Sequence, residues 1–454
     1  MIKAKGSNTL ALKRLALSDS PSSRSALRTE DRFSIADFRF KAKRIGSRNN
    51  ELTGRKRRNL RVMDTTFSPD AFHVMAKPVG ARCNLRCDYC FFLKKKHLYP
   101  HSSFVMPDSI MERYIRQTIY AHRVPEVTIA WQGGEPTLMG IDFFRRAVAY
   151  AKKCTGPTIQ IQHTIQTNGV LIDDKWCQFL KENNFLVGLS LDGPKQLHDT
   201  FRKDRNGNSV FNKVIQAAKL MQHYGIDYNI LCTINAVNSH HPLNCYTFFR
   251  DELGARYLQF IPVVERVYDS RDQKSDCITD HSVDPETFGN FLVSIFDEWI
   301  KRDVGSMFVQ MFDGVLAAYV RGYSSLCVFQ PTCGMGVALE HNGDVYSCDH
   351  YVDRDHLLGN IRQTTIGKLI SSETQRAFGI SKSSSLPRRC IECRFLFTCN
   401  GECPKNRVLD TNDGSGKINW LCEGLKLFFS HTEESMRKMA ALLKAGRAAS
   451  EIME

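Results

Sequence analysis

The stretch Cys83-Asn-Leu-Arg-Cys87-Asp-Tyr-Cys90 is the part of this 454-residue sequence on which the fold prediction depends. It places three cysteines at a C-x3-C-x2-C spacing, a few residues after an apolar run at residues 72–77. Three thiolates on one short loop can hold three irons of a [4Fe–4S] cluster, and the lack of a fourth ligand leaves one iron open to a small molecule. A partial zinc site and a chance spacing are the alternatives.

Around this loop, apolar runs rich in β-branched residues alternate with amphipathic stretches. Strands are predicted at residues 72–77, 127–131, 159–166, 186–191, 228–234 and 257–264. Helices are predicted at residues 109–122, 143–153, 174–183, 210–224, 242–252, 284–302 and 424–445, and residues 265–282 are predicted to be a loop. Strand–helix repetition of this kind indicates parallel βαβ units, and six units predict an α/β fold with a partial (β/α)6 barrel. The cysteine loop then lies at the carboxyl ends of the strands, where active sites collect.

Cysteine usage points to metal or redox chemistry. Sixteen cysteines are many for a chain without an apolar export segment, and we expect a cytoplasmic protein, in which structural disulfides are disfavoured. Eight lie near the C-terminal end, at Cys327, Cys333, Cys348, Cys390, Cys393, Cys399, Cys403 and Cys422. They suffice for two four-cysteine sites, for which structural zinc is one alternative. The other five, Cys154, Cys177, Cys232, Cys245 and Cys277, are interpreted as buried or inert thiols.

The net charge of +14 is concentrated at the start of the chain. Residues 1–62 hold 17 basic and 5 acidic residues, so the remainder carries only +2. This segment is interpreted as a basic, disordered arm or as the product of a start site upstream of Met63, with a partner-binding arm and a transit peptide as alternatives. The charge of the remainder is nearly balanced, which gives no reason to expect that it binds nucleic acid. The sequence contains no run of about 18 apolar residues, so no membrane span is predicted. A composition of 42% hydrophobic and 24% charged residues excludes collagen, a coiled coil and a mainly disordered chain.

The cysteine loop, followed by Phe91 and Phe92, resembles that of the radical S-adenosylmethionine (radical SAM) superfamily. Later segments agree in order: residues 131–137 (WQGGEPT), residues 166–169 (QTNG) and residues 190–194 (SLDGP) each end a predicted strand. The resemblance implies that Cys83, Cys87 and Cys90 bind a [4Fe–4S] cluster whose open iron holds S-adenosylmethionine, the source of a 5′-deoxyadenosyl radical. It assigns contacts with this cofactor to Tyr89, Phe92, Gln132, Gly133, Gly134, Glu135, Ser190, Arg202 and Val264.

The eight C-terminal cysteines resemble those of the SPASM domain, found in radical enzymes that modify peptides. This resemblance implies two auxiliary [4Fe–4S] clusters, which makes three in the chain. It assigns the nearer one to Cys327, Cys333, Cys348 and Cys403, and the farther one to Cys390, Cys393, Cys399 and Cys422. The expected organisation is an arm at 1–62, a radical SAM partial barrel at 63–304, a SPASM domain at 305–430, and a C-terminal helix and tail at 431–454.

Over about residues 70–430 the sequence is most similar to the anaerobic sulfatase-maturating enzymes, through the cysteine pattern, the GGEPT segment and the pair Cys348-Asp349. That family oxidises a Cys or Ser in a sulfatase Cys/Ser-x-Pro-x-Arg segment to Cα-formylglycine. The resemblance implies Asp349 as the general base, an unfolded or nascent sulfatase as substrate, and a flavodoxin or ferredoxin as electron donor. The alternatives are another SPASM peptide modifier, which forms thioether or carbon–carbon crosslinks, and a zinc-bearing protein that binds nucleic acid.

Overall fold

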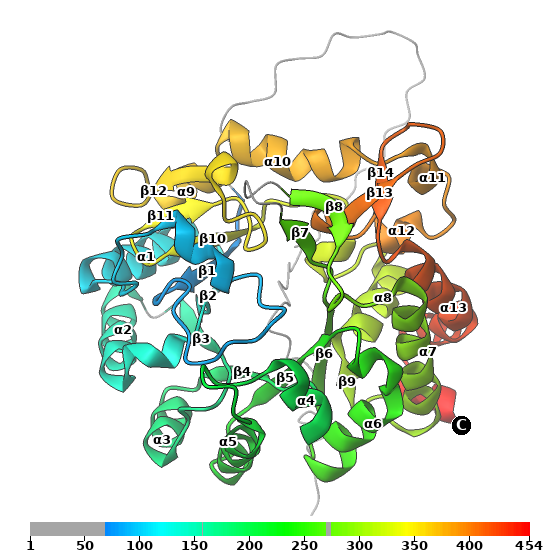
Figure 1. The fold of residues 1–454 in the computed structure, drawn as a ribbon, viewed down its shortest axis with the longest axis horizontal. Helices are drawn as coiled ribbons and strands as arrows, with labels where there is room; N and C mark the ends of the chain where they lie inside the picture. The colour runs from blue at the N-terminus through cyan, green and yellow to red at the C-terminus, as the bar shows by residue number, and fades with distance from the viewer. Residues whose placement is uncertain (1–68, 157, 269–273) are drawn as a thin grey trace, which may run out of the picture. The chain divides into compact units, whose positions relative to one another are not determined.

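A computed structural model describes residues 69–156, 158–268 and 274–454, and the basic arm at residues 1–62 lies outside them. The centre of the fold is a ten-stranded sheet with the order β12-β11-β10-β1-β2-β3-β4-β5-β6-β9 (Figure 1). Its first six strands are β1 (His73–Lys77), β2 (Glu126–Trp131), β3 (Gln160–Thr167), β4 (Leu186–Ser190), β5 (Tyr228–Ile234) and β6 (Tyr257–Pro262). All six pair in parallel with their neighbours, which confirms the six predicted strands and the α/β class.

Helices cover the outer face of these strands (Figure 1). They are α1 (Asp108–Ala121), α2 (Ile141–Cys154), α3 (Asp174–Glu182), α4 (Lys195–Phe201), α5 (Phe211–His223) and α6 (Pro242–Thr247). Five were predicted, and α4 was missed because its seven residues are too few to show a helical period. The packing of α1 includes a polar contact, since the buried Tyr114 hydroxyl accepts from the Ala130 backbone N–H (2.9 Å) and lies within hydrogen-bonding distance of the Val74 carbonyl (3.2 Å). This hydroxyl ties α1 to β1 and β2.

The C-terminal third extends the same sheet. Strand β9 (Phe308–Val309) pairs in parallel with β6, and β10 (Gly336–Glu340) pairs in parallel with β1. Beyond β10, strands β11 (Asp344–Tyr346) and β12 (Leu357–Asn360) run antiparallel. The hydrogen bonds of β1 therefore continue from the barrel into strands that belong, by sequence, to the cysteine-rich region.

Further helices pack on the β6 side of the sheet. They are α7 (Pro285–Arg302), α8 (Gln310–Arg321) and α13 (Cys422–Lys444), and α7 and α13 were predicted. The rings of Phe296, Phe312 and Phe428 join them, with that of Phe312 stacked on that of Phe428 at 5.6 Å. The cysteine-rich region also holds α9 (Ile366–Ile370), α10 (Glu373–Ser384), α11 (Arg388–Ile391), α12 (Leu396–Cys399) and a hairpin of β13 (Arg407–Asp410) and β14 (Lys417–Asn419).

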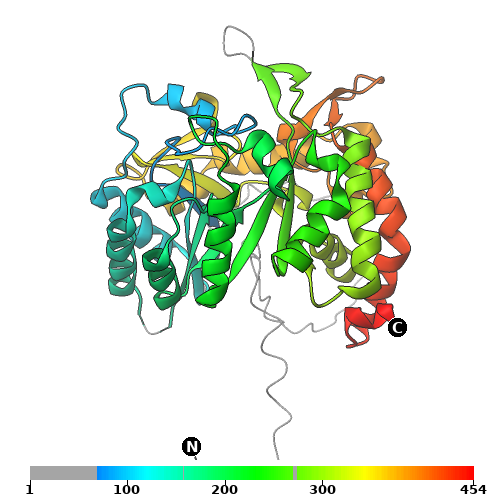
Figure 2. The same ribbon diagram turned by 60° about the horizontal axis from the view of Figure 1, so that its bottom comes forward.

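One expectation was wrong. The charged segment after β6 is not only a loop, because β7 (Arg266–Tyr268) and β8 (Lys274–Ile278) form an antiparallel hairpin at the same end of the fold as the cysteine loop (Figure 2). Polar composition hid it, since the cross-strand pairing needs no apolar face. Of the five cysteines interpreted as buried or inert, Cys177, Cys232 and Cys245 are buried, Cys154 is half-buried and Cys277 on this hairpin is exposed. Within the described residues, no helix combines the length and apolar character needed to cross a membrane.

Candidate active site

The three cysteines of the loop at residues 83–90, here called the cysteine loop, lie together beside the carboxyl ends of β1 and β2. Burial and the nearby Glu135 carboxylate raise the pKa of Cys83 to about 11, and burial raises that of Cys90. The pKa of Cys87 is raised mainly by burial, and the neighbouring thiols of Cys90 and Cys83 add to it. Neutral thiols so close together form a donor set that a metal cluster would deprotonate and fill.

Two glycines bring the β2 end against this loop. A Cβ on Gly134 would lie 1.9 Å from the Arg82 carbonyl oxygen, so no side chain fits there. Gly133 has φ +121°, which disfavours other residues. The Gly134 N–H donates to the Gly80 carbonyl (2.8 Å) and the Glu135 N–H to the Arg82 carbonyl (3.0 Å). The two glycines that the resemblance assigns to the cofactor thus also let the backbone of the cysteine loop approach β2 closely.

Glu135 crosslinks β2 to β3 through its side chain. Its fully buried carboxylate accepts from the Thr137 hydroxyl (2.6 Å), the Thr167 hydroxyl (2.7 Å) and the Asn168 N–H (2.7 Å). Asn168 in turn donates to the Asn84 side chain on the cysteine loop (2.8 Å). The carboxylate therefore serves the protein's own scaffold, and any contact of Glu135 with a cofactor must come from its backbone.

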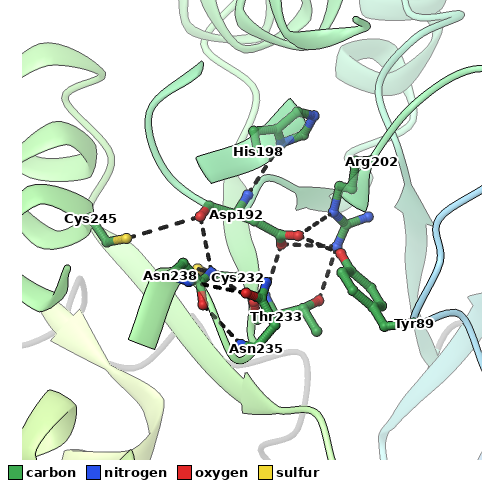
Figure 3. Close-up of polar contacts among 9 residues, drawn as sticks. All are labelled: Tyr89, Asp192, His198, Arg202, Cys232, Thr233, Asn235, Asn238 and Cys245. Atoms are coloured by element: carbon green, nitrogen blue, oxygen red, sulfur yellow. Dashed lines mark hydrogen bonds and ion pairs between the residues drawn. The ribbon is translucent and has the colours of Figure 1, made fainter. Parts of the chain in front are cut away.

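Arg202 is held by a buried aspartate at the end of β4 (Figure 3). Its guanidinium donates to Asp192 from Nε (2.8 Å) and Nη2 (3.1 Å), and Nη2 also donates to the Thr233 hydroxyl (3.0 Å). The Tyr89 hydroxyl donates to the same carboxylate, and the Tyr89 ring lies 5.6 Å from the guanidinium carbon. Ser190 lies two residues before Asp192, buried at the end of the strand. Two predicted cofactor residues, Tyr89 and Arg202, thus bind one acid, and Ser190 lies close to that acid in sequence.

A buried lysine that the sequence analysis missed joins three other predicted residues. Lys77 ends β1 with 2% of its side chain exposed, and its Nζ lies 2.5 Å from Asp349 Oδ1. The same Nζ donates to Gln132 Oε1 (3.4 Å) and lies 4.9 Å from the centre of the Phe92 ring. Burial would raise the pKa of Asp349, but Lys77 and His350 more than offset it, so the pKa falls below its ordinary value. The Asp349 carboxylate is therefore ionised at neutral pH.

Val264 lies apart from these contacts. It is buried after β6, and its carbonyl accepts from Lys405 Nζ (2.7 Å), which also pairs with Glu265 (3.3 Å). Lys405 follows Cys403 closely in sequence, so this contact ties the β6 end to the cysteine-rich region. The only sign of this contact in the sequence was a lysine two residues after Cys403.

The four cysteines assigned to the nearer auxiliary site lie together in the structure. Burial raises the pKa of Cys348 well above its ordinary value, and the adjacent thiols of Cys403 and Cys327 raise it further. Burial also raises the pKa of Cys327, and the neighbouring thiol of Cys333 adds to this rise. Cys403, at 9% exposure, thus joins three cysteines at least 55 residues before it in sequence.

The four cysteines assigned to the farther site line one cavity. Cys390, Cys393, Cys399 and Cys422 surround it together with apolar side chains of Phe395, Leu396, Leu425 and Phe429. Burial and Glu402 raise the pKa of Cys399 to about 12, so its thiol is neutral without a metal. Across the described residues no three His, Cys, Asp or Glu side chains are placed to hold a single metal ion. In a [4Fe–4S] cluster each thiolate binds its own iron, so its ligands stand apart around a cavity of this kind.

Family models match both halves of this arrangement. The Radical SAM superfamily model matches residues 78–244, and the SPASM iron-sulfur cluster-binding domain model matches residues 327–394. The folded chain is therefore a radical SAM protein with an auxiliary iron–sulfur domain.

Similar proteins narrow this class. The chain is 42% identical over 403 residues to a serine-type anaerobic sulfatase-maturating enzyme of Bacteroides thetaiotaomicron, which covers 86% of this chain and 97% of the relative. It is 34% identical over 374 residues to a cysteine-type enzyme of Clostridium novyi, covering 82% and 97%. The solved structure of native anSMEcpe with bound AdoMet and Cp18Cys peptide is 32% identical, with a TM-score of 0.74 over 82% of this chain and 99% of that one.

The chain belongs to the anaerobic sulfatase-maturating enzymes, which are radical SAM oxidoreductases. This confirms the family resemblance, the fold class and the expected cofactors, S-adenosylmethionine and three [4Fe–4S] clusters.

Proposed function

We propose that this enzyme oxidises the Cβ of one Ser or Cys in a sulfatase Cys/Ser-x-Pro-x-Arg segment to Cα-formylglycine, with release of 5′-deoxyadenosine and methionine. The observation that carries the proposal is the placement of Asp349. It follows the auxiliary-site cysteine Cys348 directly and, through Lys77, is linked to Gln132 at the cofactor end of β2. A carboxylate that can take a proton thus lies between the two kinds of site that the oxidation requires.

The residues of the barrel mouth fit the cofactor. Cys83, Cys87 and Cys90 would hold the first cluster, and Arg202 would meet the carboxylate of S-adenosylmethionine. The backbone of residues 132–135, Ser190 and Val264 would line the rest of its site, with Tyr89 and Phe92 packed against the cysteine loop. When bound, S-adenosylmethionine and its cluster supply the radical that takes a Cβ hydrogen, and the auxiliary clusters supply an acceptor for the electron.

Asp349 would take the remaining proton. Oxidation of a CH2OH group to an aldehyde, or of a CH2SH group to a thioaldehyde, removes a hydrogen atom, a proton and an electron, and the proton leaves from oxygen or sulfur. For a cysteine, water then hydrolyses the thioaldehyde to the aldehyde and the sulfur leaves as hydrogen sulfide. The Asp349 carboxylate is ionised and keeps 19% of its side chain exposed, so one edge can face a substrate while Lys77 holds the other. The lysine fixes the direction of the carboxylate, which general-base catalysis requires.

The partners follow from this chemistry. The substrate segment would be read on an unfolded or nascent sulfatase, because a folded sulfatase would bury it. A flavodoxin or ferredoxin would supply the electron that starts each turnover. We place the enzyme in the cytoplasm, because the cluster ligands must stay reduced until they bind iron.

The test is anaerobic turnover of two matched peptides, one with Ser-x-Pro-x-Arg and one with Cys-x-Pro-x-Arg. The Ser peptide is the first choice because the 42% identical relative is serine-type. It should lose the mass of two hydrogens as 5′-deoxyadenosine appears, and the purified enzyme should hold about twelve irons. Zinc with little iron would refute the proposal, and deoxyadenosine without peptide oxidation would favour a different peptide modification.

Asp349 is tested by a pair of variants. Asp349→Asn should slow peptide oxidation far more than cofactor cleavage, while Asp355→Asn, an exposed aspartate nearby in sequence, should change neither. Equal peptide oxidation by Asp349→Asn and the unaltered enzyme would remove Asp349 as the base.

A further inference from the structure

Asp192 is a buried carboxylate at the barrel mouth whose oxygens accept four hydrogen bonds. It is fully buried, two residues after the end of β4, and its oxygens accept from the guanidinium of Arg202, the backbone N–H of Thr233 (2.9 Å) and the hydroxyl of Tyr89. These donors come from the end of α4, from β5 and from the cysteine loop (Figure 3). One side chain therefore joins four segments of the chain.

The backbone of Asp192 is held as firmly as its side chain. Its N–H donates to His198 Nδ1 (3.3 Å), and its carbonyl accepts from Asn238 Nδ2 (3.2 Å) and lies 4.0 Å from the Cys245 sulfur. His198 is itself buried on α4, and Asn238 lies in a short 3-10 helix, η3 (Asn238–His240). Since both ends of the residue are hydrogen-bonded to ordered elements, the carboxylate has no freedom to follow a ligand.

The contacts divide the Arg202 guanidinium into two edges. Nε and Nη2 face Asp192 and Thr233, whereas Nη1 has no hydrogen-bond partner among the described residues. Arg202 is only 8% exposed, so without Asp192 it would be a buried cation with no counter-ion. The aspartate both neutralises the arginine and aims its remaining edge.

Tyr89 adds a link to the cluster ligands, because it stands between Cys87 and Cys90. Its ring packs edge-on against Phe201 (5.7 Å), and its hydroxyl donates to Asp192. A shift of Asp192 would thus move the cysteine loop and the arginine together.

We propose that Asp192 is a positioning residue that fixes the position of Arg202 relative to the cysteine loop, and thereby the affinity for S-adenosylmethionine. This inference rests on the proposed function, which assigns Arg202 and the cysteine loop to that cofactor. Asp192 does not touch the cofactor. It acts by holding the guanidinium edge and the loop at one fixed separation, a form of preorganisation that lowers the cost of binding.

The experiment measures S-adenosylmethionine binding to the iron-loaded enzyme by anaerobic titration calorimetry, with Asp192→Asn as the main variant. Asparagine keeps the shape and removes the charge, so the iron content should stay near that of the unaltered enzyme. The dissociation constant for S-adenosylmethionine should rise at least tenfold, while the KM for the peptide stays unchanged. Asp199→Asn is the control, because Asp199 on the same helix pairs with the half-exposed Lys195 and with the Ser209 hydroxyl, and this change should leave the dissociation constant unaltered.

Tyr89→Phe tells positioning from direct contact. Alone it should weaken cofactor binding severalfold, because a hydrogen bond to a charged group is lost. In the Asp192→Asn background the same change should have little further effect, since the acceptor is already altered. A full effect in both backgrounds would mean that the hydroxyl meets the cofactor itself, which would overturn the proposal.

The outcomes separate this inference from the proposed function. If the unaltered enzyme binds S-adenosylmethionine and oxidises peptide, but Asp192→Asn binds the cofactor within twofold of it, the inference fails alone. If the unaltered enzyme binds no S-adenosylmethionine, the proposed function fails first. If Asp192→Asn loses iron, Tyr89→Phe decides the matter: an unchanged dissociation constant overturns the inference, and a severalfold rise supports it.

Discussion

Replacing Lys77 with methionine should destabilise the enzyme and uncouple cofactor cleavage from peptide oxidation. Lys77→Met keeps the length of the side chain but leaves the Asp349 carboxylate without its cation, 2.5 Å away in the structure. Removing one partner of a buried ion pair costs about 3–5 kcal/mol, and the 19% exposure of Asp349 places this case near about 3 kcal/mol. The loss comes mainly from the unpaired charge, so it should depend on Asp349.

A double-mutant cycle measures that dependence. Lys77→Met and Asp349→Asn should each lower the melting temperature of the holoenzyme under nitrogen, and the double variant should lose less than the sum of the two, by a coupling of about 2 kcal/mol or more. The exposed pair Arg146–Asp108 is the comparison, since Arg146→Met breaks a bridge whose partners are about half exposed and should cost less than about 1 kcal/mol.

Turnover gives the second measurement. Lys77→Met should keep cofactor cleavage but lose peptide oxidation, because the carboxylate is no longer held in one direction. Strict additivity of the two substitutions, together with full peptide oxidation by Lys77→Met, would refute the reasoning, since the pair would then be neither energetically coupled nor used.

Three further perturbations have defined outcomes. Gly134→Ala should drive a Cβ into the Arg82 carbonyl and lower the iron content from about twelve to about eight, while Gly156→Ala, with open space around its Cβ, should keep all of it; full iron in both would contradict the close approach. Burial lowers the pKa of His163 from 6.5 to about 4, so as pH falls below 6.5 the unfolded chain takes up a proton that the folded chain excludes, and stability is lost. His163→Leu should therefore remove about 1.3 kcal/mol of the stability difference between about pH 7.5 and 5.5, seen as a smaller fall in melting temperature, and an unchanged fall would argue against a neutral buried ring. Lys382 is fully buried beside the nearer auxiliary site, where its Nζ donates to two backbone carbonyls (2.9 and 2.8 Å). Its positive charge should raise the reduction potential of that cluster, so Lys382→Met should lower the potential in an EPR-monitored titration. An unchanged potential would show that the charge of Lys382 does not act on the cluster.

The elements of the barrel could be predicted from sequence because their signals are local. Strands such as β4, buried along its whole length, are continuous apolar runs, and the helices between them keep a clear amphipathic period. The hairpin of β7 and β8 has neither signal, and it was missed. Cysteine spacing likewise exposed the two groups of thiols, but the return of Cys403 to Cys348 came from family resemblance, since spacing cannot show which distant segments meet.

Residues that act through partners far away in the sequence were the ones missed. Lys77 is a single charge at the end of an apolar strand, and its partner Asp349 lies 272 positions later. Asp192 was part of a quoted segment but had no role, because its value comes from donors on three other elements. The sequence gives the type of each residue, but it does not show which distant residues come into contact in the fold.

The pairing of β1 with β10 has a consequence for synthesis. His73 meets Gly336, so 263 residues must leave the ribosome before the first strand finds this neighbour. At about 5–20 residues per second the wait is about 13–53 s, during which one edge of β1 stays open. Open strand edges recruit other chains, and long-range parallel pairing is slow. Yield in a foreign host should thus depend on chaperones that shield nascent chains, and a gene cut before β10 should produce insoluble protein however complete its barrel.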